Sequence, residues 1–88
     1  MPRYIIERTT GTLTSQQVEA AGRKSKEVVS GMDDVVWIRS YVSDAAGKIY
    51  CEYDAPNEEA VLRHAELAGL PVDTISEVAL EISPSMFV

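Results

Sequence analysis

The sequence has too few cysteine, histidine and basic residues for several common kinds of site. It holds one cysteine and one histidine in 88 residues. A single cysteine excludes an internal disulfide and any zinc or redox motif built on a cysteine pair. Only 8 lysine and arginine residues stand against 14 acidic residues, which gives a formal net charge of −6. Because affinity for nucleic acid depends on clustered basic residues, we expect no nucleic-acid partner.

Long apolar runs and glycine-rich loops are also missing. No stretch approaches the ~20 apolar residues that a membrane-spanning helix needs, and the first residues lack the pattern of a secretory signal. We therefore expect a cytoplasmic protein without a membrane partner. The five glycines are spread singly, so no phosphate-binding loop is predicted. No serine lies in a nucleophile elbow, so we assign no catalytic residue. We also expect no organic cofactor.

Hydrophobic periodicity divides the chain into four strands and two helices, within one domain of residues 1–88. Thr14 and Gln17 have the spacing of a capping box at the start of the first helix. Asn57 is the predicted N-cap of the second helix, and Gly69 follows its last turn. The predicted strands are 2–9, 35–43, 48–54 and 73–81, the helices are 14–30 and 57–69, and residues 83–88 form a tail with an apolar end.

The order strand, helix, strand, strand, helix, strand is that of the ferredoxin-like split βαβ fold. Right-handed crossovers then make 4-1-3-2 the simplest order of an antiparallel sheet. We therefore predict an α+β sandwich in which both helices cover one face of the sheet.

Alternation along the second and third strands divides their side chains between two faces. The face toward the helices is predicted to hold Val36, Ile38, Val42, Ile49, Cys51 and Tyr53. The open face is predicted to hold Trp37, Arg39, Tyr41, Tyr50 and Glu52. Exposed aromatic patches of this kind mark interfaces or ligand sites. We predict a homodimer formed through the open sheet face or the C-terminal tail, and a ligand pocket lined by the same rings is the alternative.

The residues most suited to chemistry are His64, Glu7 and Glu77. Imidazole binds metals and carries protons, and one histidine with two carboxylates suits a divalent cation. Glu7 and Glu77 fall on the first and fourth strands, which are neighbours in the predicted sheet. The alternative for His64 is a packed histidine in the core. Cys51 is expected to be a small buried hydrophobe, since no third group orients a Cys–His pair.

Several segments resemble a known family. They are Arg3–Arg8, Trp37–Val42, the Tyr50-Cys-Glu-Tyr-Asp-Ala-Pro56 junction, Glu59–Ala65, Gly69-Leu-Pro71 and Ile75-Ser-Glu-Val78. Together they are similar to a family of short bacterial proteins of formerly unknown function, often described as nickel-binding. The resemblance implies a ferredoxin-like fold, a homodimer and nickel binding at the surface. His64, Glu7 and Glu77 lie in the matching segments and are the candidate ligands of Ni²⁺.

These observations leave three hypotheses for function. The first is a small dimeric metal-binding protein, with nickel as the candidate ion. The second is a cofactor-free enzyme or small-molecule binder of the dimeric ferredoxin-like type, which requires an enclosed pocket and a titratable group with a shifted pKa. The third is an interaction module in which the aromatic face serves assembly alone.

Overall fold

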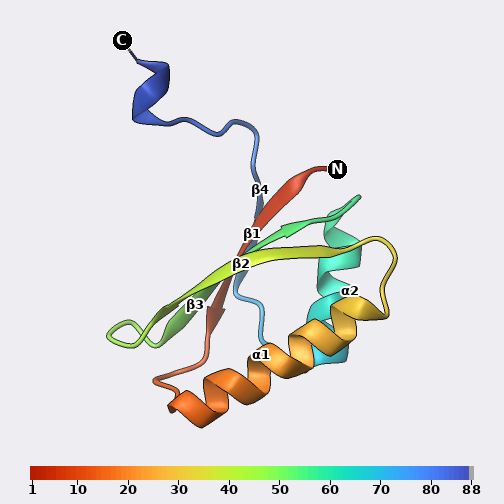
Figure 1. Cartoon of the computed structure of the whole chain (residues 1–88), viewed down its shortest axis with the longest axis vertical. Coiled ribbons are helices and arrows are strands. Elements are labelled where there is room, and N and C mark those ends of the chain that lie inside the picture. Colours follow the sequence, from red (N-terminus) through yellow and green to blue (C-terminus); the bar gives the residue numbers. More distant parts are fainter. Residues whose placement is uncertain (88) are drawn as a thin grey trace.

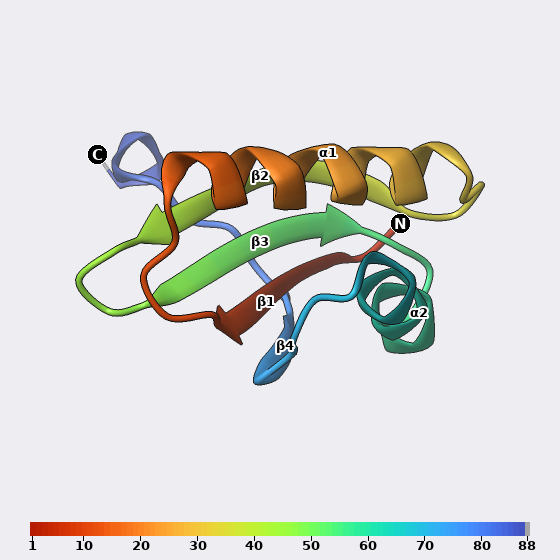
Figure 2. The ribbon, with the colours of Figure 1, turned by 90° about the horizontal axis from the view of Figure 1, so that it is seen from below.

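The computed structural model describes residues 1–87 as an antiparallel four-stranded sheet packed against two helices (Figures 1 and 2). The element order is β1 (Arg3–Thr9), α1 (Ser15–Ser30), β2 (Val36–Ser43), β3 (Lys48–Asp54), α2 (Glu58–Ala68), β4 (Thr74–Glu77) and a 3-10 helix η1 (Pro84–Met86). The sheet order β2-β3-β1-β4 is the predicted order 4-1-3-2 read from the opposite edge. The predicted ferredoxin-like fold is therefore confirmed.

Both helices begin and end where local sequence favours it. At the start of α1 the Gln17 N–H donates to Thr14 Oγ1 at 3.1 Å, and the Thr14 N–H donates to Gln17 Oε1 at 2.8 Å. This is the predicted capping box. The Asn57 side chain accepts from the Ala60 N–H at the start of α2. Gly69 ends α2 with φ of +69°, a left-handed conformation that glycine adopts without steric cost.

The side chains of β1 and β3 alternate between the helices and the open face. The inward residues of β1 are Tyr4, Ile6 and Arg8, and all three are buried. Opposite them on β3 lie Cys51 and Tyr53, also buried. Cys51 is a free thiol in the core, as predicted. The alternation therefore places one arginine among the apolar residues of the core.

A β-bulge between Trp37 and Arg39 breaks the alternation of β2. Trp37 pairs with Tyr53, and Ile38 is the extra residue of the bulge. Trp37 therefore lies on the helix-facing side with Tyr53, and Val36 lies on the open side. The predicted faces of these two residues were wrong, because strict alternation cannot take account of an inserted residue.

Strand β4 is shorter than the predicted range 73–81. It spans Thr74–Glu77, with Glu77 opposite Tyr4 of β1. The Val78 N–H still donates to the carbonyl of Arg3 at 2.8 Å. Because β1 begins at Arg3, residues 79–87 have no neighbouring strand and leave the sheet.

The C-terminal arm, residues 79–87, runs away from the rest of the molecule (Figure 1). Its large apolar side chains are 57–74% exposed: Leu80, Ile82, Met86 and Phe87. Val88, the last residue of the predicted tail, lies outside the described residues. Within residues 1–87, neither α1 nor α2 is long and apolar enough to cross a membrane.

Candidate functional site

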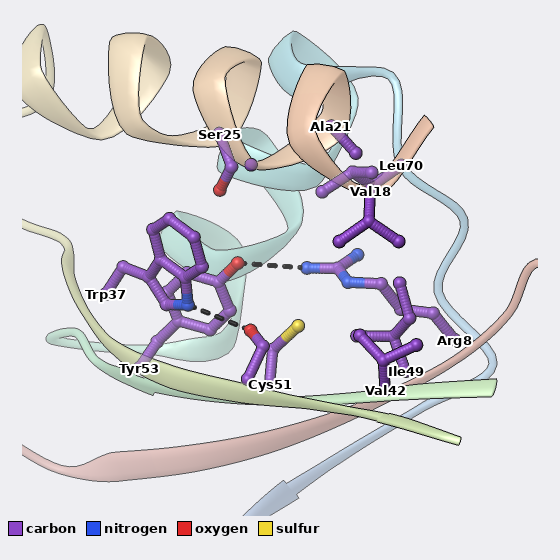
Figure 3. Close-up of a pocket in the computed structure, with 12 residues that line it drawn as sticks. Arg8, Val18, Ala21, Ser25, Trp37, Val42, Ile49, Cys51, Tyr53 and Leu70 are labelled. Atoms are coloured by element: carbon purple, nitrogen blue, oxygen red, sulfur yellow. Dashed lines mark hydrogen bonds between the residues drawn. The ribbon is translucent and has the colours of Figure 1, made fainter. Parts of the chain in front are cut away.

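A cavity of about 210 Å³ lies between α1 and the sheet (Figure 3). One turn of small residues on α1 forms its roof: Ala21, Gly22 and Ser25. Its walls and floor come largely from the three strands β1, β2 and β3: Arg8, Trp37, Val42, Ile49, Cys51 and Tyr53. Trp37 reaches the cavity because the bulge in β2 turns it inward. The cavity is largely apolar, with a few polar groups at defined positions.

Arg8 is the charged residue that lines this cavity. Its side chain is 0% exposed, although it carries a guanidinium group. Nη1 donates to the carbonyl of Pro71 at 2.8 Å and Nη2 donates to the Tyr53 hydroxyl at 3.3 Å, whereas no described residue accepts a hydrogen bond from Nε. Among residues 1–87 no carboxylate forms an ion pair with Arg8. A buried charge without a counter-ion costs several kcal/mol of desolvation free energy.

Tyr53 links Arg8 to the second helix. Its hydroxyl accepts the hydrogen bond from Arg8, and its ring lies 4.9 Å from the His64 ring between centroids. Burial raises the pKa of the Tyr53 hydroxyl, the neighbouring Cys51 adds to this, and the Arg8 charge opposes it. The hydroxyl is therefore protonated at neutral pH and is both an acceptor and a donor.

His64 projects from α2 into the core, where it is 0% exposed. Its Nε2 lies 3.2 Å from Ser25 Oγ of α1 in a hydrogen bond, and Nδ1 has no partner among the residues that the structure describes. Burial lowers the pKa of His64, the backbone of Ser25 opposes this shift, and the Arg8 charge adds to it. The ring is therefore placed as a packed core histidine that joins the two helices.

We expect the stability of the protein to fall as the pH drops below about 6.5, the ordinary pKa of histidine. Because the folded state lowers the pKa of His64, the unfolded chain binds the proton first. This contribution is complete above the unfolded pKa and is lost as the pH falls toward the folded pKa, at up to about 1.4 kcal/mol per pH unit. Urea unfolding of wild type and His64→Gln at pH 7.5, 6.5 and 5.5 measures it.

The difference between the two proteins isolates the imidazole, since the other titratable groups are common to both. We expect the difference in free energy of unfolding to change between pH 7.5 and 5.5. Parallel pH dependences in wild type and variant would contradict the assignment of a lowered pKa to His64.

The structure does not bring the three predicted metal ligands together. Glu7 lies on the open face and pairs with Lys48 at 3.3 Å. Glu77 lies on the opposite face, where it accepts a hydrogen bond from the Tyr4 hydroxyl at 3.3 Å. His64 is sealed between the helices and the sheet. Glu7 and Glu77 belong to adjacent strands, as expected, but the register places their side chains on different faces.

Within residues 1–87, no group of three histidine, cysteine, aspartate or glutamate side chains is arranged to hold a metal ion. A tight nickel site takes several imidazole or thiolate ligands. The histidine of this chain is buried, and so is its cysteine, Cys51. The donors of one described chain therefore do not fit such a site, and a site that uses His64, Glu7 and Glu77 stays a prediction.

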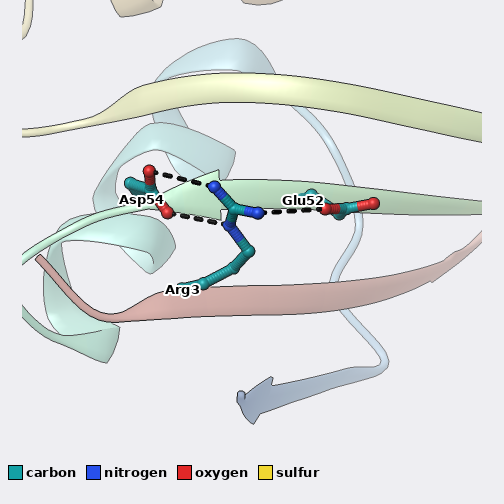
Figure 4. A network of polar contacts seen from close by, with 3 residues as sticks. All are labelled: Arg3, Glu52 and Asp54. Carbon is teal, nitrogen blue, oxygen red and sulfur yellow. Dashed lines mark hydrogen bonds and ion pairs between the residues drawn. The ribbon is translucent and has the colours of Figure 1, made fainter. Parts of the chain in front are cut away.

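The open face carries a network of ion pairs instead (Figure 4). Arg3 Nε donates to Asp54 Oδ1 at 3.0 Å, and Arg3 Nη1 lies 3.8 Å from Glu52 Oε2. The hydrogen bond from Arg3 lowers the pKa of Asp54. Arg39 lies opposite Glu52 in the register, yet the ion pair of Glu52 is with Arg3. This network joins the N-terminal end of β1 to β3.

Arg8 is the functional candidate that the sequence analysis missed. Its signal was present, because positions 4, 6 and 8 of a strand share one face and Tyr4 and Ile6 are core residues. Alternation alone would have predicted a buried arginine beside Cys51 and Tyr53.

Comparison with known proteins adds to the geometry. A family model described as nickel responsive protein SCO4226-like matches residues 4–78. The crystal structure of SCO4226 from Streptomyces coelicolor A3(2) is similar to this chain, with 30% sequence identity and a TM-score of 0.82 over 91% of this chain and 99% of that one. No curated protein matches significantly. The chain therefore belongs to the SCO4226-like family of nickel responsive proteins.

Proposed function

We propose that this protein acts as a homodimer in a nickel-related role and binds Ni²⁺ weakly through surface carboxylates. The observation that carries the proposal is the family match over residues 4–78, since the family is described as nickel responsive. The formal net charge of −6 supports it, because an acidic surface attracts divalent cations. Carboxylate oxygens without accessible imidazole or thiolate give low affinity for Ni²⁺.

Glu7 and Glu77 are the proposed ligands. Both side chains are at the surface of the sheet but on different faces. One cation that contacts both must therefore contact two copies of the chain, which couples metal binding to assembly. His64 would have to leave its place beside Ser25 and Tyr53 to join them, so we expect it to be dispensable.

Ni²⁺ is expected to stabilise untagged protein more than Mg²⁺ does. A ligand that binds only the folded state adds RT ln(1 + [L]/Kd), which is about 1.4 kcal/mol for a ligand at ten times its Kd. For a domain of this size that corresponds to a rise in Tm of roughly 5–10 °C. Thermal unfolding with 1 mM Ni²⁺ or Mg²⁺ measures the effect. A histidine tag must be absent because it binds nickel itself.

Three variants and one control locate the site. Glu7→Gln and Glu77→Gln are expected to reduce the Ni²⁺-dependent rise in Tm, whereas Glu27→Gln, an exposed carboxylate on α1, serves as the matched control. His64→Gln is expected to retain the rise. Equal stabilisation by Ni²⁺ and Mg²⁺ in wild type would refute specific nickel binding. Loss of the Ni²⁺-dependent rise in Tm in His64→Gln alone would indicate that the site lies at His64 in the core.

The second copy is proposed to cover the C-terminal arm. The large apolar side chains of the arm are exposed in the single chain, and isolated apolar arms of this size are typical of exchange between subunits. Tyr41 and Val36 on the open face of β2 are exposed as well. Sheet-to-sheet packing is therefore the alternative arrangement of the same dimer.

A second candidate function, the binding of a small molecule, is favoured by the cavity beneath α1. Binding sites for small molecules are mostly apolar pockets with a few polar groups at fixed positions. Arg8 and Tyr53 supply such groups here, and the pKa values of Tyr53 and the adjacent His64 are both shifted by burial.

A further inference from the structure

We propose that the cavity beneath α1 binds a small organic carboxylate with a flat apolar body, whose carboxylate forms an ion pair with Arg8. The inference rests on the second candidate function, small-molecule binding, and names its ligand class. It does not depend on Ni²⁺.

The uncompensated charge of Arg8 selects an anion. A guanidinium group has five N–H donors, and the two acceptors that Arg8 finds, the Pro71 carbonyl and the Tyr53 hydroxyl, are both neutral. Its Nε has no partner within the described part of the chain, although the residue is 0% exposed. The ion pairs of residues 1–87 use other basic residues. A carboxylate in the cavity would supply both the missing negative charge and the missing acceptor.

Guanidinium and carboxylate groups match in shape as well as in charge. Both are planar, and arginine binds carboxylates through two parallel N–H···O bonds. The Tyr53 hydroxyl, which accepts from Arg8 Nη2, retains its own proton and can donate it to a carboxylate oxygen beside Arg8. Figure 3 shows the Arg8 guanidinium and the Tyr53 hydroxyl directed toward each other beneath α1. Together they form the polar end of the site.

The remaining volume suits an apolar ring. A cavity of about 150 Å³ lined by apolar residues is enough to bind benzene, and this cavity measures about 210 Å³. Trp37, Val42 and Ile49 offer apolar and aromatic surface to it. A Cβ atom built on Gly22 meets no atom within 4 Å, so the roof leaves space at that point.

The cavity also reaches the surface. Val42, one of its lining residues, is 46% exposed, and Val18 at the start of α1 is half-buried. A ligand can therefore enter between α1 and β2 with its carboxylate first. The apolar body then covers the rim, and the carboxylate reaches Arg8 after a shift of the side chains that cover it.

Titration of untagged wild-type protein with benzoate tests the proposal, with benzyl alcohol as a neutral probe of similar shape. Trp37 is the single tryptophan of the chain and lines the cavity, so its fluorescence and its indole N–H signal in NMR spectra report occupancy. We expect benzoate to bind at least tenfold more tightly than benzyl alcohol and to shift the Trp37 signals.

Two variants and one control complete the test. Arg8→Met matches the arginine side chain as far as Nε, lacks the charged guanidinium group, and is expected to remove the preference for benzoate. Arg23→Met, on the exposed side of α1, is the matched control and is expected to bind like wild type. Gly22→Leu fills the roof of the cavity and is expected to weaken both probes while Arg8 stays in place.

The titrations distinguish a failure of the carboxylate inference from a failure of small-molecule binding. If benzyl alcohol binds as tightly as benzoate, or if Arg8→Met keeps the preference for benzoate, the carboxylate inference is wrong but small-molecule binding stands. If neither probe alters the Trp37 signals at 10 mM, both are wrong. Should Arg8→Met fail to fold, the comparison of the two probes in wild type and in Gly22→Leu still decides the outcome.

Discussion

Replacing Tyr53 by phenylalanine is expected to lower the free energy of unfolding by about 2 kcal/mol, because it deprives a buried cation of an acceptor. The Tyr53 hydroxyl is one of two groups that accept from Arg8. Hydrogen bonds to charged groups contribute about 1.5–3 kcal/mol each, more than those between neutral groups. The loss corresponds to a fall in Tm of roughly 10 °C for a domain of this size. Urea or thermal unfolding measures it.

A double-mutant cycle isolates the cause. In the background of Arg8→Met, the same Tyr53→Phe change is expected to cost less than about 0.5 kcal/mol, since no charge is left without an acceptor. Tyr50→Phe, on the open face of the same strand, is the control and is expected to change stability by less than about 0.5 kcal/mol. An equal cost of Tyr53→Phe in both backgrounds would show that the hydroxyl does not stabilise Arg8.

Deletion of residues 79–88 is expected to convert a dimer into a monomer at micromolar concentration. The arm holds Leu80, Ile82, Met86 and Phe87, which gain little burial in the single chain. Full burial of a large apolar side chain contributes about 1.5–3 kcal/mol, so two exchanged arms add on the order of 10 kcal/mol against the cost of association. Removing them eliminates this term. Sedimentation velocity between 1 and 100 µM measures the assembly state.

The matched control keeps the length of the arm and changes only its polar residues. Ser83→Ala with Ser85→Ala is expected to leave the dimer intact, whereas Ile82→Ser with Phe87→Ser is expected to weaken it as the deletion does. The folded domain ends at Val78, which bonds to Arg3, so the deletion leaves the sheet complete. If the deletion variant stays dimeric, the arm is not the interface and the open sheet face is the remaining candidate. If the wild type is monomeric, the proposed homodimer is wrong.

Arg8 gives the core a feature that stability alone does not explain. A buried charge without a counter-ion costs several kcal/mol, whereas a methionine at this position would pack without that cost. Proteins depart from the rules of stable packing mainly at functional sites. The benzoate titration therefore measures which ligands Arg8 binds. The double-mutant cycle with Tyr53 measures how Arg8 affects the free energy of unfolding.

Local sequence signals predicted the elements well because their physical causes are local. The Thr14–Gln17 capping box and the Asn57 cap form within one helical turn, and Gly69 takes the left-handed conformation that ends α2. The order of elements then restricted the sheet to the observed order. The candidate site was less predictable, because it combines residues from four different elements: β1, β2, β3 and α1.

Two features were predicted wrongly because they depend on pairing between strands: the face of Trp37 and the end of β4. The face of Trp37 depends on the bulge that follows it, and a bulge is a property of how β2 pairs with β3. The end of β4 depends on where β1 begins, since Val78 bonds to Arg3 and residues 79–87 have no partner strand. Neither fact is contained in the pattern of a single segment.

The amino-acid sequence by itself determined the fold class, the ends of the helices and the alternation that turns Tyr4, Ile6 and Arg8 inward. Those features depend on neighbours a few residues apart along the chain. Only the tertiary structure decided that His64 lies in the core rather than beside Glu7 and Glu77, because register and helix packing set which side chains meet. The same packing left Arg8 at the edge of a cavity without a carboxylate partner among residues 1–87, which no local pattern specifies.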